Sequence, residues 1–397
     1  MFENFESAPP DPILGLTEAF NKDPNPAKIN LGTGIYKDDS GKTPTLECIV
    51  RAEKILAETA TSGGGYLPMT GLAEYDKDTV ELLFGAGNDL GESGRAVAAQ
   101  TPGGTGGLRV AGDFIHRMLP GAKIWMSNPT WANHKGIFDA AGLETATYPY
   151  YDKATGGLDF AGMVAALRQV PAGDVVLLHT TCHNPSGMDP DTEQWKELAE
   201  IAVERGFLPL FDFAYQGFGI GIEEDAFGLR AFAEMGMELL VASSYSKNFG
   251  LYNQRVGAMT IVAKSADAAS KAMSHAKLCI RTNYSNPPAH GARLVSTVLG
   301  DAELRGIWEK DVAEMRDRIN AVRKTFVETM AAKTDKMDFS FVAKQRGMFS
   351  FSGLSVEQVH AMRDEHSIYI VDSGRISIAG ITSGNMEALC SAIAAVL

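Results

Sequence analysis

One lysine lies in a setting that could support chemistry. Lys247 belongs to Ser243-Ser244-Tyr245-Ser246-Lys247-Asn248-Phe249-Gly250, where a hydrophobic run ends in hydroxyl side chains. Taken alone, a loop lysine is more often solvated than catalytic. Two other residues change this expectation. Asp212, 35 residues earlier, lies within an apolar run, where a carboxylate is costly unless a cation or a strong donor meets it. Arg255, eight residues after the lysine, is close enough to return to the serines.

The two serines and the arginine predict an anion site. Hydroxyl groups of Ser244 and Ser246 and the guanidinium of Arg255 can all donate to phosphate oxygens. Pyridoxal phosphate requires a Schiff-base lysine, a carboxylate for its pyridine nitrogen and a phosphate site. We therefore interpret Lys247, Asp212 and this anion site as a binding site for that cofactor.

A glycine-rich segment could serve the same phosphate. Thr101-Pro102-Gly103-Gly104-Thr105-Gly106-Gly107-Leu108-Arg109 opens a helical pattern, so its N–H groups and helix dipole suit an anion. Glycine-rich turns of this kind also bind dinucleotides. We favour the dinucleotide less, because the segment lacks the full G-x-G-x-x-G spacing with an acidic residue about 20 positions on.

The elements that must position these residues alternate between strands and helices. A helical pattern covers Leu46–Ala57, and strands are predicted at Ala122–Met126, Val175–His179, Leu208–Phe213, Leu239–Ser243 and Met259–Ala263. Trp195, Leu198, Ala199 and Ala202 follow helical spacing, with Asp189-Pro190 before them and Gly206 after them as start and stop signals. This alternation predicts an α/β fold with a largely parallel sheet.

The pattern changes near residue 301. Apolar residues recur every three or four positions from Leu304 to Met330, which predicts one long helix that bridges two domains. Antiparallel strands are predicted after it at Phe339–Val342, at Met348–Phe351, and at Ile368–Val371 and Arg375–Ala379, the last two joined as a hairpin. We expect this part to form a smaller α+β domain.

Composition excludes several classes of protein. The chain is 45% hydrophobic and 21% charged, which excludes disorder as its main state. Its 36 basic and 49 acidic residues give a net charge of −13, which argues against a nucleic-acid or anionic-membrane partner. No apolar stretch is long enough to span a membrane, and the acidic N-terminal segment resembles no signal peptide, so we expect a cytoplasmic protein.

The cysteine pattern is equally plain. Four cysteines are far apart and form no C-x-x-C pair, so we expect buried reduced thiols and neither a disulfide framework nor a metal site.

Several segments, in the same order along the chain, resemble class I aminotransferases of the aspartate/aromatic subgroup. They are Leu31–Lys37, Ser127–Trp131, Cys182–Gly187, Asp212–Gly217, Ser243–Gly250, Asn283–Pro288 and Ser373–Arg375, and the similarity covers essentially the whole chain. It implies a pyridoxal-phosphate-dependent fold type I homodimer whose active sites lie at the subunit interface. The large domain would contain a mixed, mostly parallel seven-stranded sheet flanked by helices. Expected bounds are 1–12 for an N-terminal arm, 45–312 for the large domain, and 13–44 with 313–397 for the small α+β domain.

The resemblance also implies roles at the cofactor ring. Lys247 would carry the cofactor as a Schiff base and transfer the substrate proton, while Asp212 would keep the pyridine nitrogen protonated. Tyr215 and Asn184 would donate to the phenolic oxygen of the ring. Trp131 would stack on the ring, with a core tryptophan as the alternative interpretation.

Further roles follow at the phosphate. The expected phosphate residues are Gly104, Thr105, Ser244, Ser246 and Arg255, joined by Tyr66 from the neighbouring subunit. His134 and His179 would orient Asp212, with ordinary core positions as the alternative.

Two arginines would select the substrate. Arg375 would hold the α-carboxylate with Gly34 closing over it, and Arg281 would reach the distal carboxylate of a dicarboxylic amino or 2-oxo acid from the partner subunit. Trp131 and Asn184 would also contact the substrate. The resulting hypothesis is ping-pong transamination of L-aspartate and 2-oxoglutarate to oxaloacetate and L-glutamate.

Alternatives remain open. An aromatic amino acid aminotransferase with additional dicarboxylate activity is the near alternative, because the loop Ser62-Gly63-Gly64-Gly65 before Tyr66 departs from the family pattern. A decarboxylase or lyase of the same fold is less favoured, since two arginines would hold both carboxylates. A non-enzymatic binding module is disfavoured by the intact Lys247 and Asp212.

Overall fold

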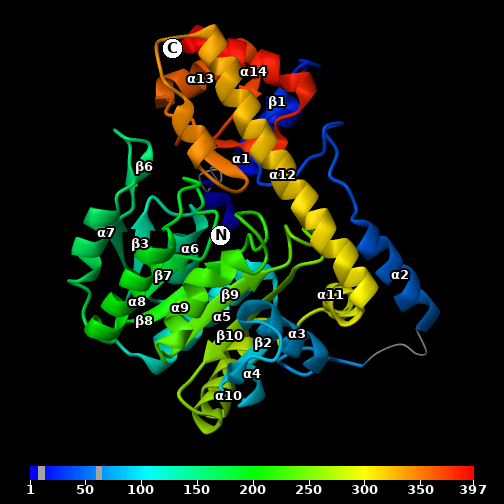
Figure 1. The fold of residues 1–397 in the computed structure, drawn as a ribbon, viewed down its shortest axis with the longest axis vertical. Coiled ribbons are helices and arrows are strands. Elements are labelled where there is room, and N and C mark those ends of the chain that lie inside the picture. The colour runs from blue at the N-terminus through cyan, green and yellow to red at the C-terminus, as the bar shows by residue number, and fades with distance from the viewer. Residues whose placement is uncertain (8–13, 60–64) are drawn as a thin grey trace. The chain divides into compact units, whose positions relative to one another are not determined.

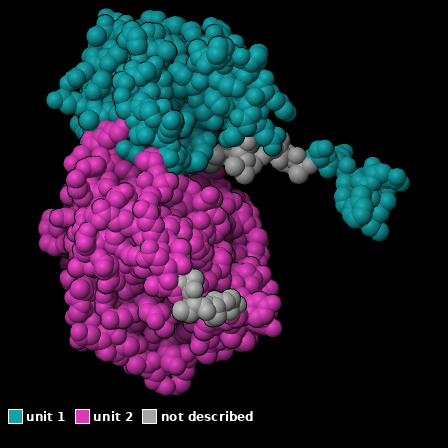
Figure 2. All heavy atoms as spheres, turned by 90° about the vertical axis from the view of Figure 1, so that its right-hand side faces the viewer, with its two compact units in different colours: residues 1–43, 185–187, 319–397 teal, residues 44–184, 188–318 magenta. Residues whose placement is uncertain are grey.

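The structure is a computed structural model that describes residues 1–7, 14–59 and 65–397. It forms two compact units. Unit 1 consists of residues 1–43, 185–187 and 319–397, and unit 2 of residues 44–184 and 188–318 (Figure 2). Part of the expected arm, 8–12, and residues 62–64 of the glycine-rich loop lie outside the described residues. The domain bounds expected from the sequence stay a prediction.

Unit 2 is built on one seven-stranded sheet (Figure 1). In spatial order the strands are β2 (Ala96–Pro102), β10 (Val256–Val262), β9 (Leu239–Ser244), β8 (Leu208–Phe213), β7 (Val175–His179), β3 (Lys123–Asn128) and β4 (Glu144–Pro149). Only β10 runs antiparallel to its neighbours, β2 and β9, and the other strands pair in parallel. The mixed, mostly parallel seven-stranded sheet is therefore confirmed.

Both faces of the sheet are buried, which explains why its central strands are almost continuously apolar. Leu177, Leu210 and Leu240 pack in one hydrophobic cluster with α5 (Gly103–Met118), α6 (Asn133–Ala140) and α10 (Ala266–Asn283). Their strand neighbours pack on the opposite face with α3 (Ala73–Phe84), α7 (Phe160–Leu167), α8 (Thr192–Arg205) and α9 (Phe227–Glu234). Each strand therefore contributes alternate side chains to two cores.

The stop signal of α8 at Gly206 is confirmed, but the helix begins two residues after the predicted start signal Asp189-Pro190. Asp191 caps the helix by accepting the Gln194 N–H, and Gly206 ends it in the left-handed conformation. The other helices of unit 2 are α2 (Glu47–Thr59), α4 (Asp89–Glu92), α11 (Ala289–Gly300) and the short η2 (Glu224–Ala226), and a small ribbon pairs β5 (Tyr151–Asp152) with β6 (Gly157–Leu158).

The predicted long helix is confirmed as α12 (Ala302–Lys333), which has 32 residues. Its residues up to Arg318 belong to unit 2, and those from Ile319 onward belong to unit 1. Unit 1 also contains α1 (Leu14–Lys22), α13 (Val356–His366) and α14 (Ser383–Val396), with short helices η1 (Phe2–Asn4), η3 (Ser340–Lys344) and η4 (Ile378–Gly380). None of the helices in the described ranges is long and apolar enough to cross a membrane.

Two strand predictions in unit 1 were wrong. Phe339–Val342 contributes to the short helix η3 instead of a strand, and its Val342 carbonyl accepts from the buried Arg323 guanidinium. The predicted hairpin of Ile368–Val371 and Arg375–Ala379 does not form either. β12 (Ile368–Tyr369) pairs in parallel with β1 (Ile29–Asn30), and β13 (Arg375–Ser377) pairs with β11 (Phe349–Phe351).

A turn accounts for the second error. The Gly374 N–H donates to the Val371 carbonyl, and Gly374 has a φ of +78°. The two segments on either side of this turn therefore pair with different strands: β12 pairs with β1, which is remote in sequence, and β13 pairs with β11.

Candidate active site

The carboxyl ends of β7, β8 and β9 bring several predicted site residues to one edge of the sheet. The register pairs His179 with Asp212 and Phe213 with Ser243. Tyr215 lies two residues after the end of β8, and Lys247 lies in the loop after β9. The Lys247 Nζ atom is 4.6 Å from the centroid of the Tyr215 ring. Binding sites of open α/β sheets occur at this edge.

The pKa of the Lys247 amine is shifted in the direction that makes the amine more reactive. Burial lowers the pKa of Lys247 from 10.5 to about 8, the Asp212 carboxylate acts against this decrease, and the Arg255 guanidinium adds to it. A substantial fraction of the amine is therefore neutral, and nucleophilic, at mildly alkaline pH.

Asp212 is held as a carboxylate. Burial by itself raises its pKa, but the hydrogen bond from His134 and the positive charge of nearby groups outweigh burial, so the pKa is lowered. The His134 Nε2 atom is 3.0 Å from Asp212 Oδ2. A buried anion at this position suits a protonated ring nitrogen.

A chain of hydrogen bonds supports this carboxylate. The Thr130 hydroxyl lies 2.8 Å from His134 Nδ1 and 3.2 Å from His179 Nε2. Burial lowers the pKa of His179 to about 3, so its ring is neutral. Ligand atoms of His134, His179 and Asp212 lie within 4.8 Å of one another. Because Thr130 and these residues already share hydrogen bonds, we assign the cluster to orienting Asp212 and not to a metal.

Asn184 lies beside the tyrosine. Its Nδ2 donates to the Tyr215 hydroxyl at 3.4 Å, and its backbone N–H donates to His179 Nδ1 at 3.3 Å. The turn before it is fixed by the Asp189 carboxylate, which accepts the N–H groups of Cys182 and His183 at 2.7 and 2.9 Å. Cys182 has a positive φ of 54°, so this turn has an uncommon backbone conformation.

Several residues of the predicted anion site lie around a narrow cradle. The Ser244 hydroxyl donates to Ser246 Oγ at 3.1 Å, and helix α5 begins at Gly103, directly before Gly104 and Thr105. A Cβ atom at Gly103 would lie 2.6 Å from Arg255 Nη2, and one at Gly104 would lie 3.0 Å from the Ser244 Cβ. Only glycine leaves this space open in front of the first turn of α5.

The remaining predicted site residues of unit 2 differ in how far their side chains are exposed. Trp131 is half-buried and forms an edge-to-face contact with His134 at 5.2 Å. Tyr66 is 94% exposed, so its ring is not packed in the core of its own chain. Arg281, in the last turn of α10, is exposed and donates to the Ser285 hydroxyl.

Two predicted substrate residues belong to unit 1. Arg375 is buried, donates to the Gly32 carbonyl at 2.6 Å and lies over the Phe349 ring, 4.2 Å from its centroid. A Cβ atom at Gly34 would come within 2.6 Å of that same ring. Gly34 and Arg375 are thus organised around Phe349.

Comparison with known proteins assigns the family. A family profile described as aminotransferase class I and II matches residues 26–393. The chain belongs to this family of aminotransferases. Enzymes of the family act on amino and keto acids.

Individual relatives extend over the full length. The chain is 55% identical to the aspartate aminotransferase of Salmonella typhi over 397 residues, covering 100% of both sequences. It is 47% identical to the aromatic-amino-acid aminotransferase of Pseudomonas aeruginosa, covering 100% of this chain and 98% of the relative. A crystal structure of the aromatic-amino-acid aminotransferase from Burkholderia pseudomallei, covalently bound to pyridoxal phosphate, superimposes with a TM-score of 0.97 at 47% identity, covering 100% and 99% of the chains. These matches confirm the fold type I architecture.

The residues of unit 2 fit pyridoxal phosphate. The glycine-lined cradle beside Ser244 and Arg255 suits a phosphate, the buried Asp212 carboxylate suits a pyridine nitrogen, and the Lys247 amine suits the aldehyde. The residues present in unit 2 are therefore of the types that the ring nitrogen, the aldehyde and the phosphate of the cofactor require.

Sequence reasoning missed two supporting residues. Thr130 was recognised within a motif but received no role, and Asp189 was interpreted only as part of a helix start. Both act through hydrogen bonds to residues that are distant in sequence, and no local pattern signals such contacts.

Proposed function

We propose that this aminotransferase transfers the amino group of L-aspartate to 2-oxoglutarate in a ping-pong reaction, with pyridoxal phosphate carried on Lys247. The observation that carries the proposal is the Lys247 amine, of lowered pKa, in one buried site with the Asp212 carboxylate and the phosphate cradle. The full-length identity of 55% to an aspartate aminotransferase supports the choice of substrate.

The cofactor, when bound, supplies an electron-withdrawing ring that acidifies the α-proton of the amino acid. Lys247 then has two roles in sequence: its amine holds the cofactor and, once displaced by substrate, accepts and returns the α-proton. Asp212 holds a proton on the ring nitrogen. Asn184 and Tyr215, which are hydrogen-bonded to each other, donate toward the ring oxygen. Trp131, which contacts His134, would cover the ring face, and it would also border the substrate, as Asn184 would.

The phosphate would be bound by five residues of this chain and by one residue of the neighbouring subunit. Those of this chain are Gly104, Thr105, Ser244, Ser246 and Arg255, and Tyr66 of the neighbouring subunit would complete the site. Two carboxylates of the substrate would be bound by arginines: Arg375, with Gly34 beside it, takes the α-carboxylate, and Arg281 takes the distal one.

We further propose a homodimer with shared active sites. Exposed residues support it: Tyr66 is 94% exposed, Arg281 is exposed on α10, and Phe2 and Phe5 in the N-terminal segment are 80% and 68% exposed. A second copy of the chain would cover these aromatic rings and receive the arginine. We also propose a cytoplasmic location, because four buried free cysteines fit a reducing compartment.

The second candidate function is dual aromatic and dicarboxylate transamination. The observation in its favour is that aromatic-amino-acid aminotransferases match this chain over its full length as well. Single-turnover rates with aspartate and with phenylalanine distinguish the two. We expect aspartate to react faster, and a phenylalanine rate equal to or above that of aspartate would replace the first proposal by the second.

A further inference from the structure

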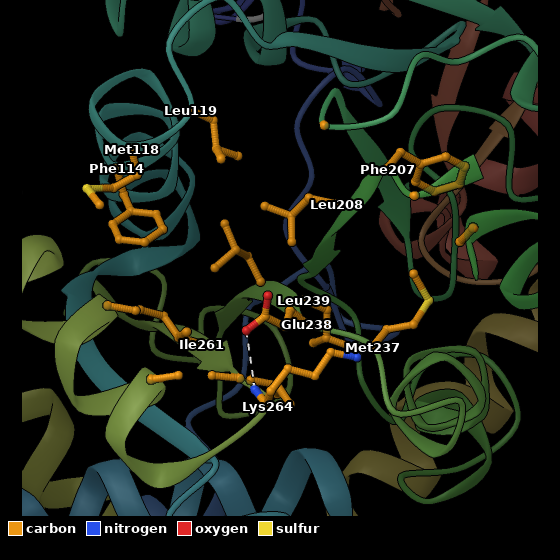
Figure 3. Close-up of a pocket in the computed structure, with 18 of the residues that line it drawn as sticks. Phe114, Met118, Leu119, Phe207, Leu208, Met237, Glu238, Leu239, Ile261 and Lys264 are labelled. Atoms are coloured by element: carbon orange, nitrogen blue, oxygen red, sulfur yellow. Dashed lines mark hydrogen bonds between the residues drawn. The ribbon is translucent and has the colours of Figure 1, made fainter. Parts of the chain in front are cut away.

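A second cavity lies in unit 2, at the edge of the sheet opposite to the active site. It has a volume of about 540 Å³ and is lined by the first residues of β8 and β9, including Leu208 and Leu239, and by the end of β10 (Figure 3). Asp212 lies four positions after Leu208 along β8, which corresponds to roughly 13 Å of strand. The cavity is thus distinct from the cofactor site.

Small side chains create this hollow. Ala268 and Ala272 of α10 face it, as do Ala202 and Gly206 at the end of α8. Around them the walls are apolar, with Phe114, Met118 and Leu119 contributed by the end of α5 (Figure 3). A volume of this size with mainly apolar walls and few polar groups is typical of small-molecule sites.

The rim of the cavity combines exposed apolar side chains with one carboxylate. Met118, Val203 and Met235 are 36%, 49% and 47% exposed, so apolar surface is accessible from solvent. Glu238 accepts a long hydrogen bond of 3.3 Å from the Lys264 N–H (Figure 3). The Lys264 ammonium is turned to the Gly236 carbonyl. Because a carboxylate can accept several donors, Glu238 retains capacity for a ligand.

The helix termini around the cavity favour positive charge. α5, α8 and α9 all end here, with their C-cap residues Leu119, Gly206 and Met235 in the lining, whereas α10 begins here. Helix C-termini carry partial negative charge and helix N-termini carry partial positive charge. The negative charge of three C-termini and Glu238 therefore exceeds the positive charge of one N-terminus and Lys264.

We propose that this cavity is a second, non-catalytic binding site for a small amphipathic amine, with the apolar body among α5, α8 and α10 and the cationic end at Glu238. This inference is independent of the substrate of the aminotransferase, because no residue of the cofactor site lines the cavity.

The probe for the test is N,N-dimethyloctylamine, a tertiary amine that is protonated at neutral pH and cannot condense with the cofactor aldehyde. Calorimetric titration of the holoenzyme in saturating maleate, which fills the active site with a dicarboxylate, should still show saturable binding. 1-Octanol and octanoate, of the same chain length, should bind more weakly, and octanoate most weakly.

Two variants locate the site. Ala272→Trp fills the cavity and should weaken amine binding by at least about tenfold, while Ala57→Trp, an exposed alanine of α2, should leave it unchanged. Glu238→Gln should weaken binding of the amine about three- to fivefold and leave 1-octanol unaffected. Wild-type transamination by all three variants shows that they fold.

Three outcomes would overturn the proposal. One is unchanged amine affinity in the folded Ala272→Trp variant. Another is displacement of the amine by maleate, which would place it in the active site. The third is octanoate binding as tightly as the amine.

Discussion

The Lys247 amine lies between two opposing charges. Arg255 destabilises its ammonium form and Asp212 stabilises it, while burial favours the neutral form. The same aspartate is kept ionised by His134. The reactivity of the lysine is therefore set by residues of three different segments, each of which can be changed separately.

The first prediction concerns this balance. Asp212→Asn removes the charge that raises the pKa of Lys247, so the pKa should fall below about 8 in the apoprotein. The neutral amine reacts with acylating reagents, so the pH at half-maximal labelling of Lys247, followed by peptide mass spectrometry, should move to lower values. Asp139→Asn, at an exposed ion pair, is the matched control. An unchanged or higher midpoint in Asp212→Asn would contradict the assignment.

The second prediction concerns the lysine itself. Lys247→Ala should still bind pyridoxal phosphate through the cradle, but turnover should fall by a factor of about 10² to 10⁴ or more, the usual worth of a positioned acid–base group. Borohydride should link the cofactor covalently to the wild-type chain and not to this variant. Lys196→Ala, at an exposed ion pair, should behave as wild type. Turnover at the wild-type rate in Lys247→Ala would remove the proposed role.

At the scale of elements, the tight start of α5 forms part of the cradle that we propose for the phosphate. Gly103 has a φ of +76°, and its missing side chain leaves room for Arg255. Gly103→Ala should therefore weaken cofactor affinity by at least about tenfold, through backbone strain and a displaced guanidinium. Equilibrium dialysis of the apoprotein measures this change. Gly306→Ala, an exposed position in α12 with open space around its Cβ, should not weaken it, and equal affinities of the two variants would refute the cradle.

A second element depends on one buried guanidinium. Arg323 of α12 is 2% exposed and donates to the carbonyls of Val342, Gly347 and Phe349 at 3.1, 2.7 and 2.6 Å. Arg323→Met would remove the guanidinium that donates to all three buried carbonyls, and we expect a loss of about 2–4 kcal/mol in the free energy of unfolding. Urea denaturation at matched protein concentration measures it. Arg51→Met, at exposed ion pairs, should cost under about 1 kcal/mol, and a similar cost for both variants would disprove the role of Arg323.

Local pattern predicted some elements and missed others for physical reasons. β7 and β8 were predicted with their observed bounds, because buried parallel strands form continuous apolar runs. β2 is rich in alanine and β4 is a largely exposed edge strand, so neither shows such a run. β12 was given the wrong partner because its neighbour β1 is remote in sequence.

The candidate site divides in the same way. Lys247, Asp212 and the serines could be predicted from residue types and spacing. Arg255 lies beside Gly103, and Ser244 lies beside the next residue, Gly104. The roles of Tyr66 and Arg281 came only from resemblance, since a contact to another subunit has no signature in one chain. Thr130 joins two histidines that lie 45 residues apart, which no spacing rule detects.

At the scale of the whole molecule, the proposed sharing of sites can be tested by complementation. Lys247→Ala and Arg281→Leu should each be inactive with aspartate. If Arg281 acts in the partner's site, a hybrid dimer keeps one site with both residues intact. Co-expression in equal amounts should therefore restore about one quarter of the wild-type specific activity, since half of the dimers are hybrids with one active site each. No restoration would mean that Arg281 serves its own chain or another purpose.

The four cysteines have a practical consequence. All are buried thiols outside any disulfide, with Cys48, Cys182 and Cys279 in unit 2 and Cys390 in unit 1, and burial raises the pKa of Cys48 and of Cys390 to about 12. A thiol in this state reacts with alkylating reagents only when its surroundings open. The chain thus carries its own reporters of internal motion. The alkylation rate of Cys390 reports how often unit 1 opens. The alkylation rates of Cys48, Cys182 and Cys279 report how often unit 2 opens, and neither measurement needs an added label.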